Sequence, residues 1–341
     1  MPSVAVLIAA YNAVDTLPRC LDSLCSQTLS DIELICIDDC STDATPTLLQ
    51  ERAAADPRIV VIRTPHNSGQ AMARNLGLER VTAPYVCMVD ADDWLSHDCL
   101  QQALDVIQAH PQTDCVAFSV VMHYDADGGR EQDYGLPAPL ARGQALSGID
   151  ALRYCADGWA LHGLYLTRTE LHRQIPFDTT SRLYSDDNTS RLHYLHSREV
   201  RACGGRYYYR RHAQSLTTSF NILSFDFMEA NLSLRRALHE YELTHSPLPE
   251  DIKQMLETQR WSIFLRCYRL YIVHRDEFIP EQQRDVSHRL TTTLATFSTA
   301  TLPASHRRRF GYLLLRQPTL FALQQRLFVA LRRLLHKPID K

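Results

Sequence analysis

The chain has 341 residues, of which 45% are hydrophobic and 22% are charged, a composition typical of a soluble globular protein. This length can bury a large core and accommodates one large domain plus an appendage. No uninterrupted apolar run approaches the ~18 residues of a membrane-spanning helix. The N-terminus has neither the basic region nor the apolar segment of a signal peptide, so we expect a cytoplasmic protein or one lying against the cytoplasmic face of a membrane.

Charge is unevenly distributed along the chain. The formal net charge is −3, but residues 305–341 contain nine Lys or Arg and one acid, so that segment carries +8 and the remainder −11. The asymmetry predicts a basic tail with a role of its own, and we expect no nucleic-acid partner.

The ten cysteines include no Cys-x-x-Cys pair, and Cys36, Cys87 and Cys115 lie inside apolar, strand-like runs. Such positions are typical of free core thiols in a reducing compartment. We therefore expect no zinc site.

Up to residue 121, short apolar runs alternate with helical patterns. Strands are predicted at 4–9, 33–37, 59–62, 85–89 and 114–121, and helices at 15–26, 44–55, 70–80 and 97–109. This alternation predicts a parallel sheet covered by helices on both faces. In such sheets, ligands bind beyond the carboxyl ends of the strands.

The rest of the chain is less regular. Residues 124–143 are polar and glycine-containing, which predicts a mobile loop or an irregular hairpin. The following elements are predicted as a helix near 149–156, a segment at 159–168, a helix at about 185–195, a strand pair around 199–211, and helices at 222–241, 251–273, 281–296 and 316–335. We divide the chain into a domain at 1–218 and a helical region at 219–341, with a basic tail at about 305–337.

The most informative stretch follows the fourth predicted strand, where an apolar run ends in Asp90, Asp92 and Asp93. Since side chains alternate along a strand, Asp90 and Asp92 are expected to project to the same side. Two hard oxygen ligands there suit Mg²⁺ or Mn²⁺ holding a phosphorylated substrate. Acids also occur in caps and turns, but the further acidic pairs at 38–39 and 186–187 favour function.

Polar residues also follow other strands of the predicted sheet. Tyr11 and Asn12 offer a stacking face and hydrogen bonds to a nucleobase, or else form a simple βα turn. Adjacent acids at 38–39 are costly without a partner, which favours binding over capping. The loop ending at Gly69 leads into a helix N-terminus with unpaired N–H groups. Arg74 in that helix braces the carboxylates, contacts a nucleotide or forms a structural salt bridge.

In this order, the motifs resemble those of the family 2 inverting glycosyltransferases, which have the GT-A fold, a Rossmann-like, mostly parallel sheet flanked by helices. The pattern reads here as Ala10-Tyr11-Asn12, Asp38-Asp39-x-Ser41-Thr42-Asp43, Asn67-x-Gly69-x-x-x-Ala73-Arg74-Asn75-x-Gly77 and Asp90-Ala91-Asp92-Asp93. The resemblance is close over about the first 100 residues and weaker to about residue 218. It implies an α/β GT-A domain with a C-terminal helical extension.

The resemblance also implies roles. A nucleotide-sugar donor, most often a UDP-sugar, would be held by Ala10, Tyr11, Asn12, Asp38, Asp39, Asn67, Gly69, Arg74, Asp90, Ala91, Arg211, His212 and Ser215. Asp92 would be the principal ligand of Mn²⁺ or Mg²⁺, with Asp90 at the metal or ribose. Asp187 would be the general base, with Asp186 beside it where the family has Glu. In isolation, these two acids also fit an ordinary helix start.

The resemblance implies metal-dependent inverting transfer of a sugar to a hydroxyl of a glycan or lipid-linked acceptor in bacterial cell-surface polysaccharide synthesis. The leucines and arginines of 307–337 predict a basic amphipathic helix in peripheral contact with an anionic membrane, at the cytoplasmic face of the inner membrane. A leucine face packed on 222–296 is the alternative. The sequence is compatible with a monomer or an oligomer. A non-catalytic scaffold, or less favourably an Asp-nucleophile phosphatase, is the alternative function.

Overall fold

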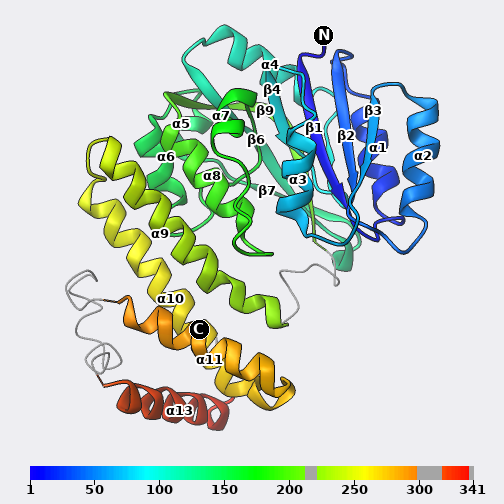
Figure 1. The fold of residues 1–341 in the computed structure, drawn as a ribbon. Coiled ribbons are helices and arrows are strands. Elements are labelled where there is room, and N and C mark those ends of the chain that lie inside the picture. The colour runs from blue at the N-terminus through cyan, green and yellow to red at the C-terminus, as the bar shows by residue number, and fades with distance from the viewer. Residues whose placement is uncertain (212–220, 298–316, 338–341) are drawn as a thin grey trace. The chain divides into compact units, whose positions relative to one another are not determined.

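The computed structural model describes residues 1–211, 221–297 and 317–337 (Figure 1). The chain forms two compact units, one comprising residues 1–155 and 159–219 and the other residues 156–158 and 220–341. The described residues contain no helix long and apolar enough to cross a membrane. All ten cysteines are free thiols and most are buried, as their apolar surroundings predict.

The first unit is built on a nine-stranded sheet ordered β3-β2-β1-β4-β8-β6-β9-β5, with β7 paired to β6. Its strands are β1 (Val4–Ala10), β2 (Ile32–Asp38), β3 (Ile59–Arg63), β4 (Tyr85–Met88), β5 (Trp94–Leu95), β6 (Thr113–Tyr124), β7 (Arg130–Tyr134), β8 (Tyr165–Arg168) and β9 (Glu199–Arg211). The strands β3, β2, β1 and β4 are parallel, whereas β8 runs antiparallel between β4 and β6. The carboxyl ends of β1, β2 and β4 therefore meet at one edge of the sheet (Figure 1).

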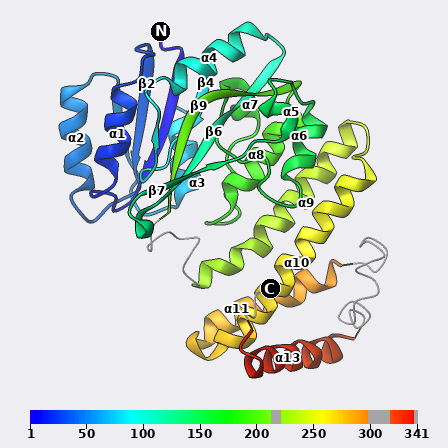
Figure 2. The same ribbon diagram turned by 180° about the vertical axis from the view of Figure 1, so that it is seen from behind.

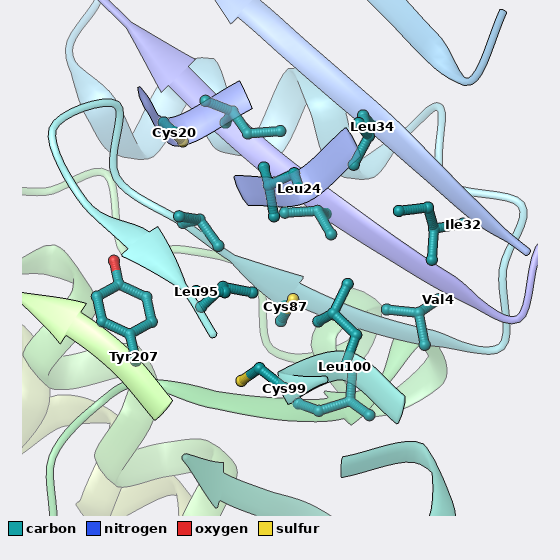
Figure 3. Close-up of a cluster of buried hydrophobic side chains, with 14 of the residues drawn as sticks. Val4, Cys20, Leu24, Ile32, Leu34, Cys87, Leu95, Cys99, Leu100 and Tyr207 are labelled. Carbon is teal, nitrogen blue, oxygen red and sulfur yellow. The ribbon is translucent and has the colours of Figure 1, made fainter. Parts of the chain in front are cut away.

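The helices of this unit cover both faces of the sheet. They are α1 (Leu17–Cys25), α2 (Thr45–Ala55), α3 (Gln70–Leu78), α4 (Cys99–Ala109), α5 (Ala138–Ala141), α6 (Gly148–Cys155), α7 (Thr169–Gln174) and α8 (Ser185–His196). Because side chains alternate along β1, Val4 packs in one core cluster with Leu24 of α1 and Leu100 of α4 (Figure 3). Ala5 and Leu7 belong to a separate cluster with α3. The expected alternation of strands and helices up to residue 121 is confirmed.

Two predictions beyond residue 121 have different outcomes. The polar stretch 124–143 contains β7, which forms a hairpin with β6. The strand pair expected at 199–211 is wrong, because β9 is one strand that lies beside β6 throughout (Figure 2). Its pairing with β6 shifts register after Ala202, so residues 203–205 form a bulge. A Cβ at Gly205 would lie 2.7 Å from the Cα of Cys99, so the glycine permits close packing on α4.

The second unit is helical, as predicted. Its long helices are α9 (Asp226–Thr244), α10 (Glu250–His274), α11 (Pro280–Ala295) and α13 (Pro318–Leu334). The predicted start at residue 222 is a short 3₁₀ turn, Ile222–Phe225, that leads into α9. The core of this unit is largely aromatic and joins Trp261 and Phe264 of α10 to Phe321 of α13.

Candidate active site

A tight turn, rather than the end of a strand, presents the acids of residues 90–93. The strand β4 ends at Met88, and the backbone N–H of Asp93 donates to the carbonyl of Asp90 at 3.0 Å. Carboxylate oxygens of Asp90, Asp92 and Asp93 all lie within 4.8 Å of one another. The acids lie close together, as predicted. The reason is the turn and not the alternation of side chains along a strand. Ala91 is buried within the turn.

Each oxygen of the Asp93 carboxylate accepts a hydrogen bond from β9. The hydroxyl of Tyr207, a fully buried residue of β9, donates to Asp93 Oδ2 at 2.7 Å. The backbone N–H of Arg210 donates to Asp93 Oδ1 at 2.8 Å. Burial, followed by the nearby charges of Asp90 and Asp92, raises the pKa of Asp93 well above its usual range. Sequence reasoning missed Tyr207, since its position in the run Tyr207-Tyr208-Tyr209 does not reveal which ring turns inward.

Asp90 is braced by Arg74. The Arg74 guanidinium is fully buried and its Nη2 donates to Asp90 Oδ1, which also accepts a 3.0 Å hydrogen bond from Gln70 Nε2. Within the described chain, Arg74 Nε and Nη1 have no hydrogen-bond partner. Burial raises the pKa of Asp90 to about 6 despite Arg74, and the charges of Asp92 and Asp186 add to this effect. This concentration of negative charge suits a divalent cation.

The acids that follow β2 have a different environment. Asp39 is buried, and its carboxylate accepts hydrogen bonds from Thr64 Oγ1 at 2.8 Å and from both the backbone and hydroxyl of Ser68 at 2.9 and 2.8 Å. The Gly69 N–H donates to its second oxygen at 2.7 Å. Burial opposes ionisation of Asp39, but these bonds outweigh it and lower its pKa. Asp39 therefore organises the loop before α3.

Asp38 and the turn after β1 are also held by local bonds. Asp38 is buried, accepts a 3.0 Å hydrogen bond from the Ser41 N–H and lies 3.2 Å from Arg63 Nε. Asn12 has a positive φ of 49° and accepts a 2.8 Å hydrogen bond from the Thr42 N–H, which fits its interpretation as a turn residue.

The residues on either side of Asn12 differ in exposure. Ala10 is buried at the end of β1 and its carbonyl accepts a 2.8 Å hydrogen bond from the Asp39 N–H. The Tyr11 side chain is 49% exposed, so its ring is accessible to a planar ligand.

The loop between α7 and α8 crosses the motif at 67–75. Asn75 holds this loop by two 2.9 Å hydrogen bonds with the backbone of Phe177, one donated and one accepted. Further along the loop, Arg182 Nη2 donates to Asn67 Oδ1, and Arg182 Nε would lie 3.5 Å from a Cβ on Gly69. Arg182 was not predicted, because nothing in its sequence surroundings marks it.

The acid pair at 186–187 lies in the first turn of α8. The N–H of Asp187 donates to Asp186 Oδ1 at 3.0 Å, within this first turn. Asp186 is also close enough to Asp90 for its charge to raise the Asp90 pKa. Burial raises the pKa of Asp187 to about 6; Arg191 opposes the rise and Asp186 adds to it. A carboxylate with this pKa can accept a proton near neutral pH.

The remaining predicted residues lie at the end of β9. Arg211 ends the strand, with its guanidinium carbon 5.3 Å from the centre of the Tyr209 ring. The neighbouring Arg210 Nε donates to Asp125 at 2.8 Å, an ion pair that directs it away from a phosphate role. His212 and Ser215 lie outside the described residues.

Comparisons with known proteins support the family resemblance that the motifs indicate. A model of glycosyl transferase family 2 matches residues 5–165. EpsH of Bacillus subtilis (strain 168) is 35% identical over 39% of this chain and 37% of its own length. ExoO, a succinoglycan biosynthesis protein of Rhizobium meliloti (strain 1021), is 26% identical over 86% of this chain and 82% of its own. The chain thus spans little more than a third of EpsH.

Solved structures share the fold across almost the whole chain. S. aureus TarS 1-349 in complex with UDP-GlcNAc has a TM-score of 0.71 at 18% identity, covering 99% of this chain and 93% of TarS 1-349. The mannosyltransferase PcManGT from Pyrobaculum calidifontis, in complex with GDP-Man and Mn²⁺, has a TM-score of 0.53 at 17% identity. The match covers 99% of this chain and 88% of PcManGT. The fold is therefore GT-A, as expected. The family model contains the acid turn after β4, and over residues 5–165 the chain is similar to glycosyl transferase family 2.

Proposed function

We propose that the protein transfers a sugar, with inversion, from a nucleoside-diphosphate sugar to a hydroxyl of a glycan or lipid-linked acceptor in cell-surface polysaccharide synthesis. One observation carries this proposal. Carboxylate oxygens of Asp90, Asp92 and Asp93 lie within 4.8 Å of one another, a cluster suited to a divalent cation. The charge of Asp186 contributes to the raised pKa of Asp90, which supports the neighbouring pair 186–187 as the source of the base.

The chemistry follows from these two groups. Asp187 takes the proton of the acceptor hydroxyl as that oxygen bonds to the anomeric carbon, and the bond to the diphosphate breaks with its electron pair leaving on the diphosphate. A pKa of about 6 leaves Asp187 largely ionised at neutral pH. Asp92 and Asp90 would hold Mn²⁺ or Mg²⁺, which would stabilise the diphosphate charge. Their hard oxygen ligands fit such a cation.

We further propose a UDP-sugar as donor. The TarS structure with the same fold holds UDP-GlcNAc, whereas PcManGT holds GDP-Man with Mn²⁺. The exposed Tyr11 ring offers the nucleobase a stacking surface, and Arg211 at the end of β9 offers the diphosphate a cation. Asp38 and Asp39 contribute to this side of the site by fixing the loops around it, since backbone N–H groups of those loops bind their carboxylates.

A titration tests the donor class directly. Binding of UDP, GDP, CDP and dTDP is measured calorimetrically with and without Mn²⁺, for the wild type and for Asp92→Ala. We expect Mn²⁺-dependent binding of UDP that is lost in the variant. Folded wild-type protein that binds none of the four nucleotides would refute the assignment.

Helix α13 supports a membrane-bound acceptor. Five leucines spaced three or four residues apart along this helix are 43–76% exposed: Leu320, Leu323, Leu327, Leu331 and Leu334. The opposite face, with Phe321 and Val329, is buried within the second unit. The exposure of the leucines favours a surface contact over the alternative, in which the leucine face packs on residues 222–296. With exposed Arg326 and Arg333 beside them, they form a surface suited to an anionic bilayer.

Vesicle flotation tests this contact. The full chain is mixed with neutral vesicles and with vesicles containing about 30% anionic lipid. We expect flotation with anionic vesicles, reduced at high salt and abolished by Leu327→Asp combined with Leu331→Asp. Equal flotation of this variant would show that α13 is not the contact, and Val60→Asp, which alters another exposed apolar residue, serves as the matched control.

A further inference from the structure

Asp93 has the position of a third metal ligand but the contacts of a structural group. Its carboxylate lies within 4.8 Å of those of Asp90 and Asp92, so position alone would make the cluster a three-acid site. However, Asp93 is 2% exposed, and each of its oxygens already accepts a short hydrogen bond from β9. A cation at Asp93 would compete with these two donors for the carboxylate lone pairs, at a side chain that burial leaves almost inaccessible.

The same contacts fix the turn on which the other two acids stand. The Tyr207 hydroxyl donates to Asp93 and accepts a 3.1 Å hydrogen bond from the backbone N–H of Asp90. The Asp93 N–H in turn donates to the Asp90 carbonyl. The first and last residues of the turn are therefore joined both directly and through one hydroxyl from a different strand. Residues 90 and 93 cannot separate without breaking a buried bond.

The support for this hydroxyl is rigid. Tyr207 is fully buried, and its ring stacks on Phe118 of β6 with centroids 6.3 Å apart. On the adjacent strand pair, Trp94 and Leu95 of β5 pair with Tyr208 and Tyr207. The chain immediately after the turn is thus hydrogen-bonded to the strand that carries the tyrosine, which fixes the hydroxyl relative to the acids.

We infer that Asp93 and Tyr207 are positioning residues: together they clamp the 90–93 turn so that Asp90 and Asp92, and not Asp93, bind the divalent cation. This inference rests on the proposed function, because it assumes that a cation binds at the turn. Partners of this kind, which orient ligands without touching the metal, typically contribute about 10- to 100-fold to metal affinity.

Three substitutions distinguish a positioning role of Asp93 and Tyr207 from metal ligation by Asp93. Asp93→Asn removes the charge and keeps only one acceptor oxygen, so one of the two donors from β9 loses its partner. Tyr207→Phe keeps the Asp93 charge and the ring packing but deletes the bridge. Asp92→Asn weakens a proposed ligand directly. Tyr208→Phe is the matched control, since that ring stacks on Trp94 and no described contact links it to the turn.

Mn²⁺ affinity is read from the electron paramagnetic resonance signal of free Mn²⁺ in the presence of saturating UDP, with thermal unfolding of each variant measured in parallel. We expect about 10-fold or greater weakening for Tyr207→Phe, more than about 30-fold for Asp92→Asn, a clearly smaller weakening for Asp93→Asn than for Asp92→Asn, and less than about threefold for Tyr208→Phe. A structural role alone would lower the unfolding temperature of Tyr207→Phe and leave its Mn²⁺ affinity unchanged.

Two results would overturn the inference. If Asp93→Asn loses as much Mn²⁺ affinity as Asp92→Asn, Asp93 is a ligand. If Tyr207→Phe binds Mn²⁺ as the wild type does, the hydroxyl does not set the turn. Failure of the proposed function looks different, because the wild-type protein itself would then bind no Mn²⁺ with any nucleotide.

Discussion

The carboxyl ends of β2 and β4 look alike in the sequence but differ in the fold. Each apolar strand is followed by adjacent acids, Asp38-Asp39 in one case and the 90–93 turn in the other. After β2, the Asp39 carboxylate accepts four hydrogen bonds and its pKa is lowered. After β4, the pKa of Asp90 is raised to about 6 among neighbouring acids.

The difference shows that acids at a strand end have two distinct uses. Donors from the chain's own loop stabilise Asp39 as a carboxylate, so it acts as a structural anchor. At the turn after β4, burial and then the charges of Asp92 and Asp186 raise the pKa of Asp90 against the effect of Arg74, so a bound cation would stabilise its ionised form. The predictions below test this division.

Asp92→Ala should have the largest effect. On the β4 side, loss of a ligand should reduce kcat/KM by more than about 10³-fold, since the leaving diphosphate loses its cation. The unfolding temperature should hardly change. Transfer activity with the identified donor and differential scanning calorimetry measure the two quantities, and a large loss of stability would place Asp92 with Asp39 instead.

Asp187→Asn should reduce kcat by about 10²- to 10³-fold. In the wild type at saturating Mn²⁺, kcat should fall as the pH drops below about 6, because protonated Asp187 cannot accept the hydroxyl proton. The residual activity of the variant should lack this acid limb. A pH–rate profile measures both, and an unchanged acid limb in the variant would assign the base elsewhere.

Asp39→Asn should act mainly on stability. Two or more buried donors lose a charged acceptor, at a cost of about 2–3 kcal/mol in the free energy of unfolding. Because folding lowers the Asp39 pKa from 3.8, this contribution is fully present above pH 3.8 and is lost as the pH falls through the lower, folded-state pKa. Urea unfolding at pH 7 and near pH 3 measures it, and an equal difference at both pH values would contradict the assignment.

Thr64→Val should have the smallest effect. It removes one of the four bonds to Asp39 while keeping the shape of a buried side chain, so we expect a loss of about 1 kcal/mol in unfolding free energy. Loss of metal binding in this variant would mean that the two strand ends are not independent.

Sequence periodicity predicted the parallel strands β3, β2, β1 and β4, because their short apolar runs alternate with helical patterns. It did not predict the insertion of β8 between β4 and β6, since a strand of four residues has no readable period. The single strand β9 was mistaken for two because Gly204 and Gly205 are typical of a turn, whereas here they allow a bulge against α4.

The candidate site shows the same limit. The motif order located the acids, and Asn12 adopts the turn form that its residue type favours. Which carboxylates are held by hydrogen bonds within the protein depends on the hydroxyls of Thr64, Ser68 and Tyr207. No sequence pattern marks these three residues as donors. Their partners are set by the fold and not by spacing.

The hydrogen bonds that join the site have a consequence for the order of folding. Asn75 and Phe177 are separated by 102 residues, Asp93 and Tyr207 by 114, and Asn67 and Arg182 by 115. Such contacts require closure of long loops, which makes them late and slow compared with the formation of α1 or α3. After dilution from denaturant, helical circular dichroism should recover before nucleotide binding does. We therefore expect a newly made chain to form its helices first and to assemble the candidate site last.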